Sequence, residues 1–424
     1  METTNETPTS LPARSIPFSP PDITEAEIEE VVDALRSGWI TTGPKTKAFE
    51  HELAAFTHAE GVACLSSATA ALECGLRALD IGPGDEVVTS AYTYTASASA
   101  ICHVGATPVL ADVLPGTYEI DPAQVAARVT ERTKAVIPVD VAGRMVDYDA
   151  LFAALDEVRA LWRPEGEVQG RFDRLPVLAD AAHSLGASYR GRPSGSVADL
   201  TAFSFHAVKN LTTAEGGALA WREGAFDSEA LYREVMLLSL HGQTKDALAK
   251  TKVGAWEYDI AFPGWKCNMT DIQAALGLAQ LRRYPALLAR RRAIVERYEA
   301  GLAPTGTAPI RHFDGASSSS AHLMLVQLPP ECGEGNPEAR IRVRNRVIEL
   351  MAEDGIATNV HYKPLPLLTA YRNLGFAIED YPHAYAQYTG EITLPLHTLL
   401  SDEDVDYVLA SFARALARAA SETA

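Results

Sequence analysis

Short apolar runs alternate with helical stretches between residues 61 and 205, and this alternation is the feature that most constrains the fold. The apolar runs read GVACL, EVVTS, TPVLADV, KAVIPVDV, PVLAD and LTAFSF. Helical patterns follow three of them, near Ala70, Ala96 and Tyr148. Such runs are typical of strands buried on both faces, and the helices between them connect parallel neighbours. We therefore expect an α/β fold with a mostly parallel central sheet.

The chain on either side of this region predicts further elements. Thr24 and Glu27 form a capping-box pattern at the start of a helix that Gly38 can end. A long helical pattern later in the chain is followed by the strand-like AHLMLVQL and by two more helical patterns. The 424 residues suffice for more than one domain. We expect three parts: a flexible N-terminal extension over residues 1–23, a large domain over residues 24–284 and a smaller α+β domain over residues 285–424.

The net charge limits the partners that this chain can have. Lys and Arg total 37 against 55 Asp and Glu, a formal charge of −18. Such a surface repels the phosphates of nucleic acids and of anionic lipids, so we expect neither as a partner. No apolar stretch reaches the roughly 18 residues of a membrane-spanning helix. A local basic pocket could still bind a small phosphorylated ligand, because net charge acts mainly at long range.

The cysteines and the N-terminal sequence indicate the compartment. The five cysteines are scattered and odd in number, and no Cys-x-x-Cys pair or His at zinc spacing accompanies them. This pattern fits a reducing compartment and predicts no metal site. The start, METTNETPTSLPARS, lacks the apolar run of a secretion signal. We therefore expect a cytoplasmic protein.

Lys209 is the first candidate for chemistry. It follows the apolar run LTAFSF by a few residues, and hydroxyl groups and glycines come directly after it in NLTTAEGGAL. A lysine taken alone is most often a surface charge. A lysine held out of water at the end of a buried strand has a lowered pKa and can form a Schiff base with a carbonyl group.

Asp180 and His183 form the second candidate group. Asp180 ends the apolar run PVLAD, and His183 follows three residues later. In open α/β sheets, ligands bind beyond the carboxyl ends of the strands. Pyridoxal 5′-phosphate (PLP) needs an acidic partner for its ring nitrogen, which Asp180 can supply. Taken alone, the pair also fits a helix-capping Asp and a buried structural His.

Two further strand ends complete the pattern. In CLSSATAAL a strand leads through Ser67, Ala68 and Thr69 straight into a helix, whose first N–H groups can bind a phosphate. In SAYTYTASASA, Tyr92 and Tyr94 follow another strand, where an aromatic ring can stack on a flat heterocycle. Each signal is weak alone, since small residues cap helices and tyrosines fill cores. Their combination in one α/β domain is more specific and predicts a PLP site.

These residues resemble the DegT/DnrJ/StrS family of aminotransferases, which are PLP enzymes of fold type I that aminate keto-sugars attached to nucleotides. The similar runs are SGWITTGPKT, SSATAAL, PGDEVVTSAYTYTASASAI, GATPVLADV, ADAAHSLGA, SFHAVKNLTTAEGGAL, PGWKCNMTDIQAALGLAQL, NVHYKPLP and LPLH. Within the family, SGWITTGPKT and SFHAVKN are most similar to the aminotransferases that form UDP-4-amino-4-deoxy-L-arabinose. The resemblance implies a large domain with a mostly parallel central sheet and a smaller C-terminal α+β domain.

The resemblance also implies roles for the candidate residues. Lys209 would form the Schiff base with PLP, Asp180 would face the pyridine nitrogen, and His183 would contact the ring hydroxyl. The remaining cofactor-binding positions are Tyr94, which would stack on the ring, and Ala68, Thr69, Ser204 and Asn268, which would hold the phosphate. Asn268 would reach the phosphate from the neighbouring subunit. The resemblance therefore implies a homodimer with shared active sites.

The substrates follow from the same resemblance. Glutamate would donate the amino group and a nucleotide-linked keto-sugar would accept it, with Trp39, Ile40, Thr41 and His361 near the sugar. Lys266 or the arginines of residues 282–297 could bind the diphosphate, although an ion-paired, solvated helix face explains those arginines more simply. A keto-cyclitol is the alternative acceptor. A non-catalytic PLP-binding regulator is a further alternative, which the short N-terminal extension and the negative charge disfavour because no DNA-binding segment is evident.

Overall fold

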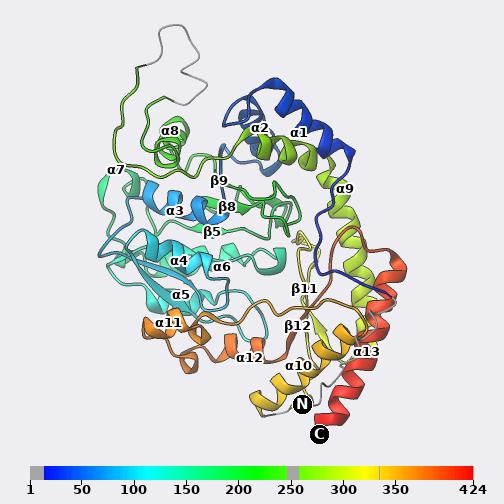
Figure 1. The fold of residues 1–424 in the computed structure, drawn as a ribbon. Helices are drawn as coiled ribbons and strands as arrows, with labels where there is room; N and C mark the ends of the chain where they lie inside the picture. Colours follow the sequence, from blue (N-terminus) through cyan, green and yellow to red (C-terminus); the bar gives the residue numbers. More distant parts are fainter. Residues whose placement is uncertain (1–13, 246–256, 334, 424) are drawn as a thin grey trace, which may run out of the picture.

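The computed structural model describes residues 14–245, 257–333 and 335–423. Figure 1 shows helices packed around a central sheet, with a second, smaller part formed by the C-terminal residues in yellow to red. The fold is α/β, as the alternating sequence pattern predicts. No helix among the described residues has both the length and the apolar character that crossing a bilayer requires.

The central sheet has the order β1-β9-β8-β5-β4-β2-β3, with β5 joined to β4 by single bridges at Val136–Val177 and Val139–Asp180. All neighbours are parallel except β9, which runs antiparallel to both β1 and β8. The strands are β1 (Gly61–Leu65), β2 (Glu86–Ser90), β3 (Thr107–Ala111), β4 (Thr133–Ile137), β5 (Leu178–Asp180), β8 (Leu200–Ser204) and β9 (Gly217–Trp221). The predicted mostly parallel sheet is confirmed, and every predicted run contributes a strand.

Both faces of this sheet are apolar because successive side chains point to opposite sides. On β1, Ala63 and Leu65 join a cluster with α3, α4 and α8, whereas Val62 and Cys64 join a cluster with α2 and α9. At the strands beyond β5, that is β4, β2 and β3, the helices α5 and α6 pack on the sheet in place of α2 and α9. These helices are α2 (Pro44–Thr57), α3 (Ala68–Ala78), α4 (Ala96–His103), α5 (Pro122–Arg128), α6 (Tyr148–Glu157) and α8 (Ser228–Ser239), and short α7 is Gly166–Gln169.

The predicted first helix is α1 (Glu25–Ser37). Its capping box joins Thr24 and Glu27, and Gly38 ends it in the left-handed conformation (φ 77°). Both α1 and α2 pack on α9 (Asp271–Leu302). Figure 1 shows this pair at one end of the molecule.

The smaller part is built on the three-stranded antiparallel sheet β10-β11-β12. Its strands are β10 (Ala308–Pro309), β11 (Met324–Gln327) and β12 (Glu391–Leu394), and its helices are α10 (Pro337–Glu353), α11 (Thr369–Asn373), α12 (Pro382–Gly390) and α13 (Asp402–Thr423). A two-stranded ribbon, β6 (Ser188–Tyr189) with β7 (Arg192–Pro193), lies outside both sheets. The predicted boundary between residues 284 and 285 falls inside α9, whose first half packs in the large core and whose second half packs against β11, β12, α10 and α13.

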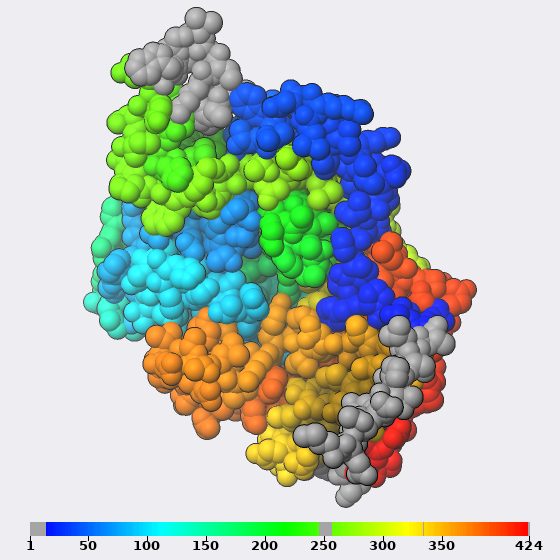
Figure 2. All heavy atoms as spheres, in the orientation of Figure 1, coloured from blue at the N-terminus to red at the C-terminus, as the bar shows by residue number. Residues whose placement is uncertain are grey.

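The N-terminal segment lies against the smaller part. Of the extension predicted over residues 1–23, residues 1–13 lie outside the described residues. Within the rest, Ile16 is buried and bridges to Ile356, and Arg14 pairs with Asp404. Figure 2 shows this segment in dark blue running along the orange and red C-terminal residues. Residues 14–23 therefore dock on the fold through apolar and ionic contacts.

Candidate active site

A cavity of about 410 Å³ lies at the carboxyl ends of the parallel strands. Its walls come from residues after β2, β5 and β8, from the start of α3, and from the C-terminal segment around His361. Strand ends of a parallel sheet meet at one edge, so residues far apart in sequence reach one cavity. It brings together Ala68, Thr69, Tyr94, Asp180, His183, Ser204, Lys209 and His361, eight of the predicted site residues.

Lys209 lies on the turn after β8, where its N–H donates to the carbonyl oxygen of His206 at 2.9 Å. Burial lowers the pKa of the Lys209 amine from 10.5 to about 8, and the negative charge of Asp180 opposes that fall. A larger share of the amine is therefore neutral at neutral pH than for a surface lysine. Only the neutral amine attacks a carbonyl carbon, so the lowered pKa favours nucleophilic chemistry at this position.

Asp180 ends β5 with its carboxyl group buried. Its Oδ2 accepts a hydrogen bond from the Ser97 hydroxyl at 2.6 Å, and its Oδ1 accepts one from the Ala182 N–H at 3.2 Å. Burial raises the pKa of the Asp180 carboxyl, while these hydrogen bonds and Lys209 oppose the rise. A carboxyl group held in this way has a fixed orientation and can pair with a cationic ring N–H in the cavity.

His183 is held in one neutral tautomer. The Ala142 N–H donates to its Nδ1 at 3.2 Å, so this nitrogen carries no proton. Its Nε2 then carries the proton and donates to the Tyr362 hydroxyl oxygen, 3.0 Å away. Burial lowers the pKa of His183 well below its ordinary range, and the charges of Lys209 and His361 add to the fall.

The first turn of α3 borders the cavity and can bind an anion. Ser67 caps the helix, and its Oγ accepts the N–H of Ala70 at 3.1 Å. The N–H groups of Ala68 and Thr69, the first two residues of the helix, have no acceptor within it. Both residues line the cavity. These donors and the positive end of the helix dipole suit a phosphate group.

Strand β9 approaches this helix start so closely that only glycine fits. A Cβ on Gly217 would lie 2.3 Å from the Ser67 carbonyl carbon and 2.4 Å from the Ala68 nitrogen. Gly217 also pairs with Ser204 of β8, whose side chain lies in the cavity wall. The sheet thus places the hydroxyl of Ser204 on the same side as the free N–H groups of α3.

Aromatic and imidazole rings also border the cavity. Tyr94 is 61% exposed, and its ring centroid is 5.9 Å from that of Tyr362. His361 stacks on Phe18 at 5.5 Å, so the N-terminal segment contributes to the site. Burial and the charge of Lys209 lower the pKa of His361 to about 4.

His322 is a further buried imidazole, with its ring centroid 4.3 Å from that of His183. The Asn210 side chain donates to the Ser320 carbonyl oxygen, so its Oδ1 accepts from Nδ1–H of His322 at 2.8 Å. Burial lowers the pKa of His322 well below its ordinary range, and the charges of His183 and Lys209 contribute. His322 is therefore neutral with its proton on Nδ1.

Sequence reasoning missed four residues of this site. Ser97 lies in the quoted run SAYTYTASASA, Tyr362 directly follows His361, and His322 begins the strand-like AHLMLVQL, so their segments were visible but their roles were not. Phe18 reaches the cavity from the N-terminal segment. Its polar, Pro-rich surroundings carry no sequence signal for such a contact.

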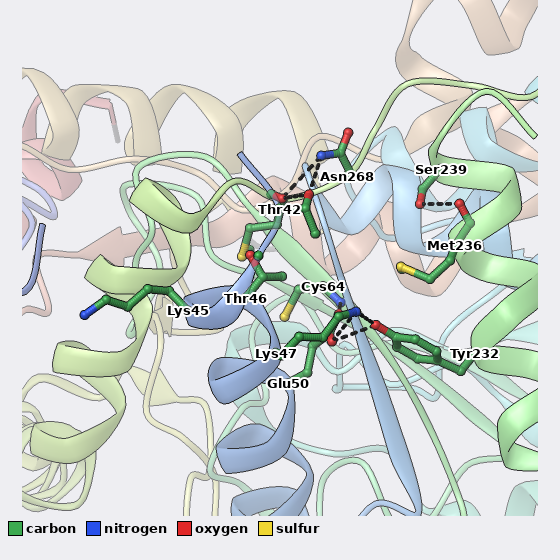
Figure 3. A network of polar contacts seen from close by, with 12 residues as sticks. Thr42, Lys45, Thr46, Lys47, Glu50, Cys64, Tyr232, Met236, Ser239 and Asn268 are labelled. Carbon is green, nitrogen blue, oxygen red and sulfur yellow. Dashed lines mark hydrogen bonds and ion pairs between the residues drawn. The ribbon is translucent and has the colours of Figure 1, made fainter. Parts of the chain in front are cut away.

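Four predicted site residues lie outside this cavity. Figure 3 shows Asn268 beside Thr42, with the amide of Asn268 donating to the Thr42 hydroxyl at 2.5 Å. Trp39 donates from its ring N–H to the Thr42 carbonyl oxygen at 3.1 Å, and Ile40 and Thr41 are exposed. None of these four residues lines the cavity of its own chain. Ile40 and Thr41 lie on the surface, whereas Asn268 is buried and bridges to Leu65, two residues before the cavity-lining Ser67.

The arginines of residues 282–297 do not line the cavity. Arg283 pairs with Glu27, Arg290 with Asp402, and the buried Arg291 donates to main-chain carbonyl oxygens. Arg282, Arg292 and Arg297 also pair with carboxylates. The alternative of an ion-paired helix face is therefore the one the structure supports.

Comparison with known proteins identifies the family of this chain. The model of the DegT/DnrJ/EryC1/StrS aminotransferase family matches residues 21–413. The chain belongs to this family. It is 40% identical over 398 residues to the spore coat polysaccharide biosynthesis protein SpsC of Bacillus subtilis, covering 93% of this chain and 95% of SpsC.

Solved structures agree with this assignment. The putative sugar aminotransferase Spr1654 from Streptococcus pneumoniae is 54% identical in its PMP form, with a TM-score of 0.91 over 96% of this chain and 100% of that one. Its PLP form is 52% identical over the same shares, with a TM-score of 0.90. Helicobacter pylori PseC, an aminotransferase involved in the biosynthesis of pseudoaminic acid, is 26% identical over 96% and 100%, with a TM-score of 0.82. The protein is a PLP-dependent sugar aminotransferase of fold type I.

The cavity residues fit PLP. The free N–H groups of Ala68 and Thr69 suit the phosphate, and the buried carboxyl of Asp180 suits the protonated ring nitrogen. The amine of Lys209 suits the aldehyde. When bound, PLP supplies an electron sink that stabilises a carbanion at the carbon carrying the amino group.

Proposed function

We propose that this enzyme transfers the amino group of glutamate to a nucleotide-linked keto-sugar, as a homodimer with shared active sites. The observation that carries the proposal is one cavity that holds Lys209, whose pKa is lowered, the buried Asp180 and a helix start with free N–H groups. The PMP and PLP forms of Spr1654 are the two cofactor states of a transamination and support the same chemistry. A cytoplasmic location stays a prediction from the sequence.

In this proposal Lys209 is the proton carrier. Its neutral amine takes a proton from the carbon that carries the amino group of the donor. Asp180 keeps the ring nitrogen of the cofactor protonated through a charge-assisted hydrogen bond, for which Ser97 and the Ala182 N–H orient it. His183, which the Ala142 N–H and the Tyr362 hydroxyl hold in place, would contact the ring hydroxyl of the cofactor. The sugar then accepts the amine by the same steps in reverse.

The lining of the cavity supports a polar, uncharged sugar ring at the reacting end of the acceptor rather than a second amino acid. His361, His322 and Asn359 of the C-terminal part line the same cavity as Lys209. Burial keeps both imidazoles neutral, so each ring has one donor and one acceptor. Because His322 donates its Nδ1–H to Asn210, its Nε2 can accept a hydrogen bond only from a hydroxyl group. SpsC and PseC are named for the biosynthesis of a polysaccharide and of pseudoaminic acid, which agrees with a sugar acceptor.

The shortage of positive side chains in the cavity supports an active site shared between two subunits. Among the described residues that line the cavity, Lys209 is the sole Lys or Arg. Glutamate carries two carboxylates and a nucleotide carries a diphosphate, so further cations are needed. Lys266 donates to the Asn268 side chain on the surface that also holds Trp39 and Thr41. A second subunit would bring this surface, and its lysine, to the cavity.

The absorption spectrum of the purified holoenzyme tests the proposed donor. Adding glutamate without an acceptor should remove the visible band of bound PLP, because the cofactor is converted to its amino form. Lys209→Ala should fail to convert bound PLP to its amino form, while the exposed-site control Lys363→Ala should respond as wild type does. A wild-type band that persists in glutamate contradicts the donor.

The acceptor is tested on the enzyme converted by glutamate. UDP- and TDP-linked 4-keto-6-deoxyglucose and the keto-cyclitol scyllo-inosose are offered separately. A keto-sugar nucleotide should restore the visible band. Restoration by scyllo-inosose alone would refute the sugar-nucleotide proposal and leave the donor half-reaction intact.

A further inference from the structure

Strand β12 holds a buried carboxyl group beside the segment that carries His361. On one edge, β12 pairs with β11, and on the other its Thr393 exchanges main-chain hydrogen bonds with Asn359 at 2.8 and 3.1 Å. Two residues further along, the N–H of His361 donates to the Glu391 carboxyl oxygen Oε2 at 2.8 Å. The side chain of Glu391 thus binds the main chain of His361 where the strand pairing ends.

The same carboxyl group reaches the imidazole of His361 through one hydroxyl group. The Thr393 Oγ1 lies 2.6 Å from Glu391 Oε1 and 2.9 Å from His361 Nδ1. The His361 ring lines the cavity, and Phe18 stacks on it. A continuous chain of hydrogen bonds therefore runs from a fully buried acid to a ring at the site.

Packing alone does not explain the acid. Both Glu391 and Thr393 are completely buried, and no Lys or Arg in the described part of the chain forms an ion pair with Glu391. A buried carboxyl without a cation is costly, and apolar residues of the same volume would pack better. Buried ionisable groups of this kind gather at functional sites.

The groups around Glu391 decide its charge. They are Tyr92, Tyr118 and Tyr362, the ring of His361, and the guanidinium of Arg344, which donates to the Tyr388 carbonyl oxygen. Burial raises the pKa of the Glu391 carboxyl to about 8, with Thr393, the His361 N–H and Arg344 opposing the rise. At neutral pH the carboxyl group therefore holds its proton.

We propose that Glu391 and Thr393 are positioning residues that fix the tautomer of His361, so that its Nε2 donates a hydrogen bond to an oxygen of the sugar. A neutral Glu391 donates its proton to the Thr393 oxygen, and the Thr393 hydroxyl in turn donates to His361 Nδ1. The single proton of the neutral imidazole then resides on Nε2, the ring nitrogen that does not face Thr393. When Glu391 ionises, Thr393 donates to it instead, and Nε2 becomes an acceptor.

This inference rests on the proposed sugar transfer, and the kinetic test separates the two. Thr393→Val keeps the shape of the side chain but removes the hydroxyl, so the KM for the keto-sugar should rise about 10-fold. Conversion of the cofactor by glutamate alone should stay at the wild-type rate, because the donor does not need His361. Thr393→Ser is the matched control and should restore the wild-type KM.

A double variant distinguishes positioning from a structural role. Thr393→Val should add nothing to the KM of His361→Phe if it acts through the imidazole. Glu391→Gln keeps a donor toward Thr393 at every pH, so it should abolish the rise in sugar KM that wild type shows above about pH 8. Equal losses from Thr393→Val in both backgrounds, or a slowed donor half-reaction, would overturn the inference.

The tautomer can also be read without any sugar. In the holoenzyme with ¹⁵N-labelled histidine, the ring nitrogen shifts report which nitrogen carries the proton, and the His361 signals are those lost in His361→Phe. Wild type at neutral pH should carry the proton on Nε2, and Thr393→Val should give a mixture. A wild-type proton on Nδ1 at neutral pH would overturn the inference even if sugar transfer is established. Failure of glutamate to convert the cofactor would instead refute the proposed donor.

Discussion

Replacing Lys209 by methionine should make the protein without its cofactor more stable at neutral pH. An amine whose pKa falls from 10.5 to about 8 carries a penalty of about 3 kcal/mol in its charged form. Methionine is unbranched and of similar length, so it fills the space without that charge. Asp180 loses its nearby cation in the variant, which raises its pKa further and cancels part of the gain. We expect a net gain of about 1–2 kcal/mol in the free energy of unfolding.

The pH dependence of this gain gives a second check. Between pH 8 and 10.5 the unfolded lysine still binds its proton and the folded one has lost it. The stability of wild type therefore rises with pH over this window, relative to the variant. The difference between the proteins should be full below pH 8 and vanish near pH 10.5. Urea titrations of the two cofactor-free proteins measure it, with the exposed-site variant Lys363→Met as control. A Lys209→Met protein that is no more stable than wild type at neutral pH, or a difference that does not change with pH, would refute the reasoning.

Two further predictions concern the phosphate site and the second subunit. Gly217→Ala places a Cβ 2.3 Å from the Ser67 main chain, which should destabilise the fold by about 1–3 kcal/mol and weaken PLP binding in a titration. Gly82→Ala meets nothing closer than 3.8 Å and should leave both unchanged, and equal effects would contradict the role of the close approach. If the active site is shared, inactive Lys209→Ala and Asn268→Asp proteins should regain about a quarter of wild-type activity when refolded together, because half of the dimers contain one intact site. No recovery from mixed dimers would refute sharing.

The sequence predicted the parts of this site that depend on strand ends. Asp180 and Ser204 terminate apolar runs, and a parallel sheet brings such ends to one edge, so their meeting with Lys209 follows from local pattern and sheet geometry. The antiparallel course of β9 could not be predicted. Its run GGALAW is as apolar as its neighbours, and strand direction depends on how the chain returns to the sheet.

Contacts between segments that are far apart in the chain could not be predicted from the sequence either. Phe18 reaches His361 across more than three hundred residues, and Glu391 meets the same segment from β12. A polar residue on a short strand normally faces solvent, and only the tertiary packing shows Glu391 to be completely buried. The position of Asn268 outside the cavity lining likewise depends on how the chain folds back after α8.

The charges around the cavity form one connected arrangement. Burial lowers the pKa of His183, His322 and His361, and the positive charge of Lys209 adds to the fall, so all three imidazoles stay neutral. A neutral imidazole has one donor and one acceptor, and the hydrogen bond at each Nδ1 decides which is which. Charged imidazoles would compete with Lys209 for the carboxylate of Asp180. They would also attract the carboxylates of a substrate without regard to the direction of a hydrogen bond. Because they stay neutral, they can distinguish sugars by the direction of hydrogen bonds, while the proton moves through the lysine.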